Sequence, residues 1–200
     1  MIIKTKSRLL TLLLVVGFCG RNAWALVGDT PAPTSNKDYC VSSGGSVVKL
    51  HAEFDTHAGF VGGVTKEFCQ YVQNSNVAIV GLDTLSTTPT LAATYTQKLV
   101  IDTTNEHSNA LPQKPYSNPA LNVCLLLHGS EIAFSSADGG FAGKDGQADV
   151  CIFGDGSAIS AWSMIYAATG ARADIIQHLR SAPLAINIPS LYAGPTTADQ

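Results

Sequence analysis

Polar and apolar positions between residues 118 and 134 predict a helix followed by a strand. Asn118 is a good N-cap and Pro119 suits the first helical position, so the apolar run 120–127 is expected to be helical. Gly129 is expected to end this helix as a C-terminal cap. The segment 131–134 then has a strand-like pattern.

A second strand and a second helix are predicted after a Gly- and Asp-rich loop at 135–146. Residues 148–153 form the strand, and Gly154-Asp155-Gly156 forms a turn, because these residue types tolerate positive φ. Ser157 is expected to cap the last helix. Trp162 is expected to be a core aromatic of that helix.

The first half of the chain repeats this order. Cys40 and Cys124 each begin a C-x4-G-S pattern, which is followed by an alternating segment and an acidic, Gly-rich loop. Each half then closes on a cysteine with an aromatic residue two positions later, at Cys69 and Cys151. Self-similarity in a fixed order indicates two copies of one structural unit.

The predicted fold class is α+β, with two tandem small disulfide-stapled helix-hairpin-helix (α-β-β-α) repeats. A periodic segment with Leu91, Tyr95 and Leu99 is interpreted as the final helix of the first repeat, after an inserted strand, and 172–180 as a short additional helix. The expected organisation has five parts, listed here: a signal peptide at 1–25, a first, degenerate repeat at 26–101, a linker at 102–117, a second repeat at 118–170 and a C-terminal extension at 171–200.

The N-terminus has the pattern of a secretory signal peptide. Basic residues at 4, 6 and 8 precede a short apolar run at 9–18, and Ala23-Trp24-Ala25 supplies a cleavage signal. The apolar run is shorter than the roughly 20 residues that a membrane-spanning helix needs, so no stable membrane anchor is expected. Lipidation of Cys19 is the alternative, but Phe18 stands where a small residue is required. The expected location is periplasmic or extracellular.

Four cysteines remain after residues 1–25 are removed. An even number in an exported chain implies disulfides, and four cysteines allow three connectivities. The repeat favours one staple for each copy, which pairs Cys40 with Cys69 and Cys124 with Cys151.

The charge of the exported part argues against nucleic acid as a partner. Residues 1–25 contain four of the 12 Lys and Arg residues and none of the 15 Asp and Glu residues, so 26–200 carries a net charge of −7. Its basic residues are scattered singly and form no footprint for nucleic acid or anionic lipid.

The sequence does not predict catalysis, a cofactor or a metal. The five histidines lack metal-ligand spacing, and Asp138, Asp145, Asp149 and Asp155 lack the periodic pattern of a calcium loop. A nucleophile elbow is missing, and the four remaining cysteines are expected to be oxidised. We therefore expect a non-enzymatic protein.

The segment 118–168 resembles the bacterial domain of unknown function 333, a family of secreted or envelope proteins often labelled as haemolysins. The resemblance lies in N-P-A-x3-C-x4-G, a D-G-G loop and V-C-x-F-x-D-G-S-x-I-x-x-W. Residues 36–76 resemble a degenerate copy, in which Gln73-Asn74-Ser75-Asn76 replaces the Asp-Gly turn and no tryptophan follows. The resemblance implies export and a stapled α+β domain, and it brings no catalytic residues.

Two functions follow as expectations. The first is an exported binding or inhibitor-like module for a protein partner, because stapled domains display rigid surfaces. The alternative is a haemolysin-like membrane-damaging factor. The predicted contact surface is the loop 55–63, with His57 and Phe60 exposed. Gly129, Asp155, Gly156 and Trp162 are assigned structural roles.

Overall fold

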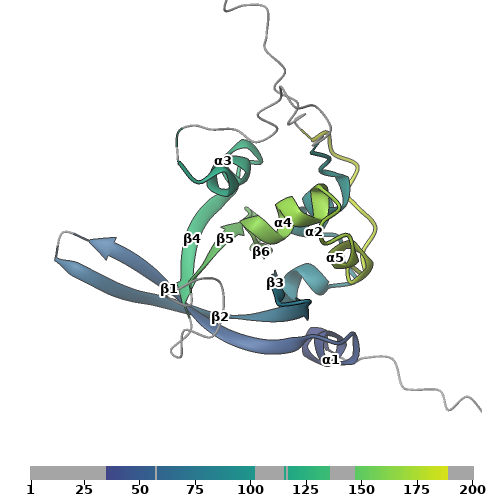
Figure 1. The fold of residues 1–200 in the computed structure, drawn as a ribbon, viewed down its shortest axis with the longest axis horizontal. Helices are drawn as coiled ribbons and strands as arrows, with labels where there is room; N and C mark the ends of the chain where they lie inside the picture. Colours follow the sequence, from purple (N-terminus) through teal and green to yellow (C-terminus); the bar gives the residue numbers. More distant parts are fainter. Residues whose placement is uncertain (1–34, 57, 102–114, 116, 136–146, 189–200) are drawn as a thin grey trace, which may run out of the picture. The chain divides into compact units, whose positions relative to one another are not determined.

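The computed structural model describes residues 35–56, 58–101, 115, 117–135 and 147–188, which belong to one compact unit (Figure 1). The predicted signal peptide at 1–25 lies outside these residues. So do the loop 136–146 and most of the predicted linker 102–117.

Six antiparallel strands of the described chain form a closed barrel. The sheet order is β1-β2-β3-β6-β5-β4, and pairing of β4 with β1 at His51↔Ser135 closes it. The strands are β1 (Ser46–Thr56), β2 (Gly59–Gln73), β3 (Asn76–Gly81), β4 (Ser130–Ser135), β5 (Gln147–Ile152) and β6 (Ala158–Ser160).

Short helices connect these strands. Ser35, Thr90 and Asn118 each accept a hydrogen bond from a backbone N–H in the first turn of the helix that follows, so the N-cap predicted at Asn118 is confirmed. The helices are α1 (Asn36–Ser42), the 3-10 helix η1 (Leu82–Leu85), α2 (Leu91–Lys98), α3 (Pro119–Leu126), α4 (Ala161–Ala168) and α5 (Asp174–Gln177).

The prediction of two helix-hairpin-helix repeats is wrong. Each half contributes three strands, of which the third in the second half was not predicted. Strands of different halves pair with each other, β1 with β4 and β3 with β6. The physical reason is that three strands leave two open edges and one apolar face, which a half of this length cannot cover. Pairing the halves covers both edges at once.

The two halves nevertheless have equivalent registers. Val80 pairs with Cys69 on β2, and Ile159 pairs with Cys151 on β5. Val80 and Ile159 each pair with the second cysteine of their own half and also with each other. The two halves are therefore related by an approximate twofold axis through the barrel wall.

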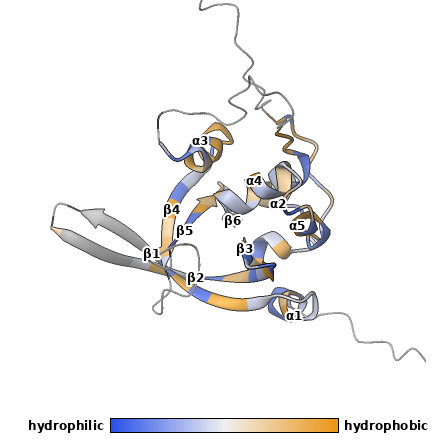
Figure 2. Ribbon diagram, in the orientation of Figure 1, coloured by the Kyte–Doolittle hydropathy of each residue, from blue (hydrophilic) through white to orange (hydrophobic). Residues whose placement is uncertain are grey.

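Two hydrophobic cores lie on opposite faces of the barrel wall. The inner core consists of strand residues and contains Phe68 and Phe134, whose ring centroids lie 5.2 Å apart. The outer core lies between the barrel and the helices and contains all four disulfide cysteines. Hydrophobic stretches on α3 and at the start of β1 are visible in orange in Figure 2. The inner core is formed by Leu50, Ala52, Phe68, Ile79, Phe134, Ala148, Val150 and Ala158.

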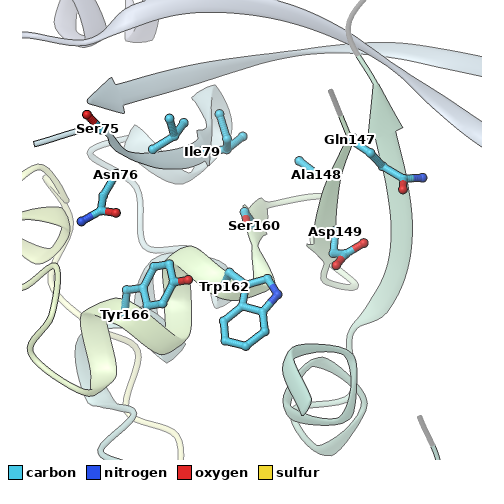
Figure 3. A pocket seen from close by; sticks show the side chains of 10 residues that line it. Ser75, Asn76, Ile79, Gln147, Ala148, Asp149, Ser160, Trp162 and Tyr166 are labelled. Carbon is cyan, nitrogen blue, oxygen red and sulfur yellow. The ribbon is translucent and has the colours of Figure 1, made fainter. Parts of the chain in front are cut away.

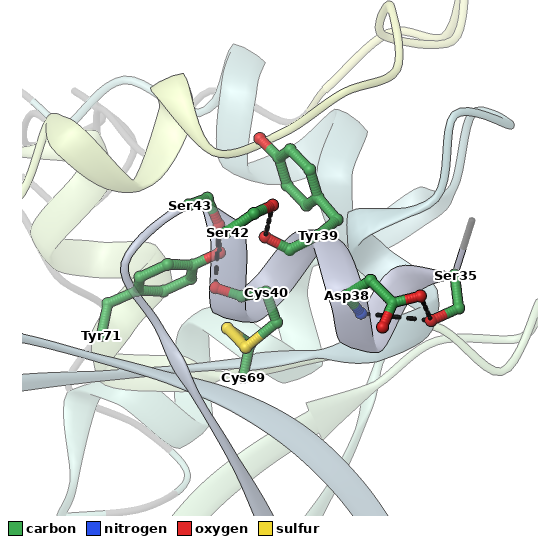
Figure 4. The surroundings of a disulfide bond; sticks show 8 residues. All are labelled: Ser35, Asp38, Tyr39, Cys40, Ser42, Ser43, Cys69 and Tyr71. Carbon is green, nitrogen blue, oxygen red and sulfur yellow. Dashed lines mark hydrogen bonds between the residues drawn. A yellow bond between two sulfur atoms is a disulfide. The ribbon is translucent and has the colours of Figure 1, made fainter. Parts of the chain in front are cut away.

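The predicted disulfide pairing is confirmed. Cys40 is bonded to Cys69, and Cys124 to Cys151 (Figure 4 shows the first). Each bond ties the helix that opens a repeat to the strand that carries its second cysteine. Two disulfides indicate an oxidising compartment outside the cytoplasm.

The helix end predicted at Gly129 has a different cause. His128, with φ of 60°, is the left-handed residue that ends α3, as Gly44, with φ of 89°, ends α1. Gly129 is instead required by space, because a Cβ there would lie 2.9 Å from Cys124 Sγ and would also collide with Cys151 Sγ. Gly45 meets Cys69 Sγ in the same way.

The last predicted helix begins later than expected. Residues 158–160 form β6, and α4 starts at Ala161 after the N-cap Ser160. Ser157 does not cap α4. Its hydroxyl accepts a hydrogen bond from Ala92 N at 2.9 Å, in the first turn of α2. The residues 157–160 are compatible with either a helix start or a strand. Pairing of 158–160 with β5 makes them a strand.

Candidate functional site

An opening in the barrel wall lies between β3 and β5 (Figure 3). It encloses a cavity of about 420 Å³, within the range of about 300–1,000 Å³ that ligand pockets occupy. Its lining residues come from β3 and the turn before it, from β5, and from the junction of β6 with α4. They are Ser75, Asn76, Val77, Ile79, Gln147, Ala148, Asp149, Ser160, Trp162 and Tyr166.

The opening exists because β6 is short. In the described chain β6 meets β3 at the single pair Val80↔Ile159 and meets β5 at three pairs ending with Val150↔Ser160. After Ser160 the chain turns into α4, so β6 does not continue between Asn76–Ile79 and Gln147–Asp149. Neighbouring strands lie about 4.8 Å apart, which makes this gap roughly one strand wide.

The cavity has an apolar floor and a polar, aromatic rim. Val77, Ile79 and Ala148 belong to the inner core or pack against it, and they form the floor. Asp149 lies at the rim on β5, and Trp162 and Tyr166 lie at the rim on α4 (Figure 3). Alternation of side chains along β5 therefore gives the site two chemically different depths.

Hydrogen bonds to neighbouring elements hold the β3 side of the opening. Ile79 N donates to Ser163 Oγ of α4 at 3.0 Å, inside the buried part of the wall. Arg172 donates from Nη1 to Asn76 O at 2.9 Å, and its guanidinium is held by Asp174 at 2.8 Å. These bonds fix the position of β3 beside the cavity.

Asp149 is oriented by the start of α3. Asn118 Nδ2 donates to Asp149 Oδ2 at 2.8 Å, while Asn118 Oδ1 accepts from Ala120 N. Burial raises the pKa of Glu131 on the adjacent strand β4, and the negative charge of Asp149 raises it further. Asp149 is the acidic residue among those that line the cavity.

Trp162 is partly buried rather than enclosed by the core. It packs against the outer core, and its ring centroid lies 5.7 Å from that of Tyr166 with the planes tilted by 31°. The two rings form an aromatic wall along the opening. Trp162 thus combines the predicted packing role with a place at the cavity.

Comparisons with known proteins give no family for this chain. No family model matches it, and neither curated proteins nor solved structures include a match. The function must therefore be argued from the site alone. The resemblance of 118–168 to the domain of unknown function 333 stays a prediction.

The predicted turn residues Asp155 and Gly156 lie away from this opening and hold α2 in place. Asp155 accepts hydrogen bonds from Leu91 N at 2.7 Å and from Ser157 N at 3.0 Å and Oγ at 2.6 Å. Gly156 has φ of 82°, as the predicted turn requires. Burial raises the pKa of Asp155, but these hydrogen bonds lower it by more, so its pKa lies below the usual range.

The predicted contact loop 55–63 belongs to a long hairpin. β1 and β2 pair as far as Asp55↔Phe60 and Thr56↔Gly59, so the segment is strand and tight turn rather than an open loop. His57 lies outside the described residues, as does the side chain of Phe60. Their assignment as contact residues stays a prediction.

Sequence reasoning missed the cavity because its residues do not form a motif. In the part of the chain that is described, no group of three or more His, Cys, Asp and Glu residues could hold a metal ion. None of the described helices is long and apolar enough to span a membrane. A signal was available in the repeat itself, since the position of Ala148 in the second half is occupied by Lys66 in the first.

Proposed function

We propose that this chain is an exported, non-enzymatic binding module whose ligand enters the opening between β3 and β5. It resembles protein inhibitors in presenting its binding site on a rigid, disulfide-bonded fold. The single observation that carries the proposal is this preformed cavity, with an apolar floor and an aromatic and acidic rim. The lining combines apolar side chains with polar ones, and a concave site in which polar groups are placed beside apolar surface is the usual form of a ligand-binding site.

Rigidity supports a binding role. Cys124–Cys151 ties α3 to β5 beside the cavity, and Ser163 ties α4 to β3. A preorganised site loses less conformational entropy when it binds, so little affinity is spent on ordering the protein. The signal-like segment 1–25 and the resemblance to secreted and envelope proteins support the location.

A fragment screen tests the proposal. Mixtures of cationic, anionic, neutral polar and apolar fragments are added to the protein without residues 1–25, and binding is detected by saturation-transfer NMR. Ala148→Leu adds volume to the cavity floor, and Val64→Leu, on an exposed side chain of β2, is the matched control.

The proposal expects at least one fragment class to bind the wild type and the control but not Ala148→Leu. Fragments that bind all three proteins equally, or none, would overturn it. Each variant is compared with the wild type by thermal melting, so that loss of binding is read only from folded protein.

A further inference from the structure

The approximate twofold axis predicts a second wall opening in the first half, at the position equivalent to the cavity. Lys66 and Ala148 are equivalent, since each lies three residues before the second cysteine of its half and each pairs with an inner-core residue, Leu50 or Phe134. Counting along the chain from the paired residues Val80 and Ile159 identifies three further sets of equivalent residues, one from each half. They are Val77 with Gly156, Asp83 with Trp162, and Thr84 with Ser163.

Hydrogen bonds confirm this correspondence. Thr84 Oγ1 donates to Ala158 O at 2.7 Å and accepts from Ala158 N at 3.1 Å. The equivalent hydroxyl, Ser163 Oγ, accepts from Ile79 N. Ile79 and Ala158 are themselves equivalent, because each precedes a residue of the Val80↔Ile159 pair. The two openings are therefore built on the same plan.

In the first half, a lysine of the chain itself occupies the equivalent position. Lys66 Nζ donates to Gly156 O at 3.2 Å and forms an ion pair with Asp83. Only 23 % of the Lys66 side chain is exposed. A primary ammonium on a flexible alkyl chain thus occupies this position, with a backbone carbonyl and an acidic partner around it.

The second half has a backbone carbonyl at the equivalent position but lacks both the lysine and its acidic partner. Ala148 replaces Lys66 and leaves the cavity open, while Val77 corresponds to the residue whose carbonyl accepts from Lys66. In an antiparallel strand N–H and C=O groups alternate between edges, so the C=O of Val77 lies on the same edge as Ile79 N, which faces α4.

The cation-binding groups of the second opening differ in detail. Trp162 stands in the place of Asp83, and an aromatic face attracts ammonium groups. Asp149 at the rim supplies the carboxylate. The net charge of −7 on residues 26–200 favours the approach of a cation.

We infer that the cavity between β3 and β5 binds a primary ammonium on an alkyl chain, presented as the lysine side chain of a partner protein. This inference rests on the proposed binding function and names its ligand chemistry. The ammonium takes the position that Lys66 Nζ has in the first half, between the Val77 carbonyl, the Trp162 ring and the Asp149 carboxylate. The alkyl chain lies on the floor formed by Ile79 and Ala148.

The probes are matched peptides and a free amine. Acetyl-Ala-Lys-Ala-amide is compared with acetyl-Ala-norleucine-Ala-amide, which keeps the alkyl chain without the charge. Free n-butylamine distinguishes a small amine from a lysine in a peptide. Binding is followed by the fluorescence of Trp162, the only tryptophan outside residues 1–25, and by the NMR signal of its indole N–H.

We expect saturable binding of the lysine peptide, at least about tenfold weaker binding of the norleucine peptide, and weaker binding of n-butylamine than of the lysine peptide. Tighter binding of n-butylamine than of the lysine peptide would contradict a partner's lysine as the ligand and indicate a small free amine instead. Equal binding of the two peptides, or binding of neither, would overturn the ammonium inference.

Two variants separate this inference from the proposed function. Ala148→Lys supplies the ammonium from within and should abolish peptide binding. Asp149→Asn keeps the acceptor for Asn118 and should weaken the lysine peptide about tenfold while leaving the norleucine peptide unchanged, even if Ala148→Lys does not fold. If a neutral or anionic fragment binds and Ala148→Leu removes it, while the lysine peptide does not bind, the binding function stands and the ammonium inference fails.

The position of Lys66 provides a converse test. Lys66→Ala should lower the melting temperature, and n-butylamine should restore part of the loss in this variant and not in the wild type. A melting temperature of Lys66→Ala that does not respond to n-butylamine would contradict the assignment of these openings as ammonium sites.

Discussion

At the scale of single residues, two of the described glycines are required by close approach rather than by backbone conformation. Gly45 and Gly129 occupy equivalent positions where a Cβ would collide with a disulfide. Their place in the repeated C-x4-G-S pattern identified them, but the pattern suggested a helix cap. The pattern could not show the reason, because the collision involves a cysteine that lies more than twenty residues further along the chain.

Gly129→Ala should destabilise the protein by about 1–3 kcal/mol, the usual cost of forcing a carbon into a packed core. The added Cβ would lie 2.9 Å from Cys124 Sγ and 3.1 Å from the Phe153 ring, closer than packed carbon atoms allow. Urea unfolding measures the difference. Gly154→Ala is the control, because no described atom lies within 4 Å of a Cβ built there, and it should be nearly neutral. Equal effects of the two variants would contradict the steric explanation.

Asp155 should stabilise the protein in a pH-dependent way. Its pKa is lower in the folded protein, so its contribution is present above the pKa of the unfolded chain and is lost as pH falls through the folded value. Asp155→Asn should therefore be less stable than the wild type at pH 7, and the two should converge in acid. Urea unfolding at pH 7 and pH 3 tests this. A difference that is as large at pH 3 as at pH 7 would mean that the charge is not its cause.

At the scale of elements, the three-residue strand β6 is the piece that sequence patterns could not reveal. Residues 157–166 have helical spacing of their apolar positions, and that spacing hides a strand whose partners lie on β3 and β5. The termination of β6 at Ser160 then creates the cavity. Because the cavity results from where a strand stops, it has no local signature.

Hydroxyl groups of the following helices fasten β3 and β6 to each other. Thr84→Val keeps the shape of the side chain and removes both hydrogen bonds to buried Ala158, so it should cost about 1–3 kcal/mol. Ser163→Ala removes the single bond from Ile79 N and should cost less. Chemical denaturation ranks the two variants. A larger loss for Ser163→Ala would contradict the account of how β6 is held.

At the scale of the whole molecule, the repeat was predictable and its assembly was not. Cysteine spacing identified two copies and their disulfides, because each bond closes within one copy. Strand pairing between copies involves residues such as His51 and Ser135, whose alternating pattern fits any partner. Only the need to cover open edges and the inner core joins the halves into one barrel.

Neither half should fold alone. Fragments 33–101 and 115–188 each lack the partner strands that complete the inner core, in which Phe68 of one half contacts Phe134 of the other. Circular dichroism should show each fragment without a cooperative thermal transition and the joined chain with one. A cooperative transition in either fragment would support independent repeats. The disulfides should each add about 3.5 kcal/mol to the joined chain in the loop-entropy model.

The most direct test of the account is a map of where a ligand binds. ¹⁵N-labelled protein is titrated with acetyl-Ala-Lys-Ala-amide, and chemical-shift changes are followed residue by residue. We expect changes concentrated at Val77, Asp149 and the Trp162 indole, with none at Ala58 and Gly59 at the hairpin tip. Changes concentrated at the hairpin tip would contradict the assignment of the wall opening as the binding site and would favour the contact surface around His57 and Phe60.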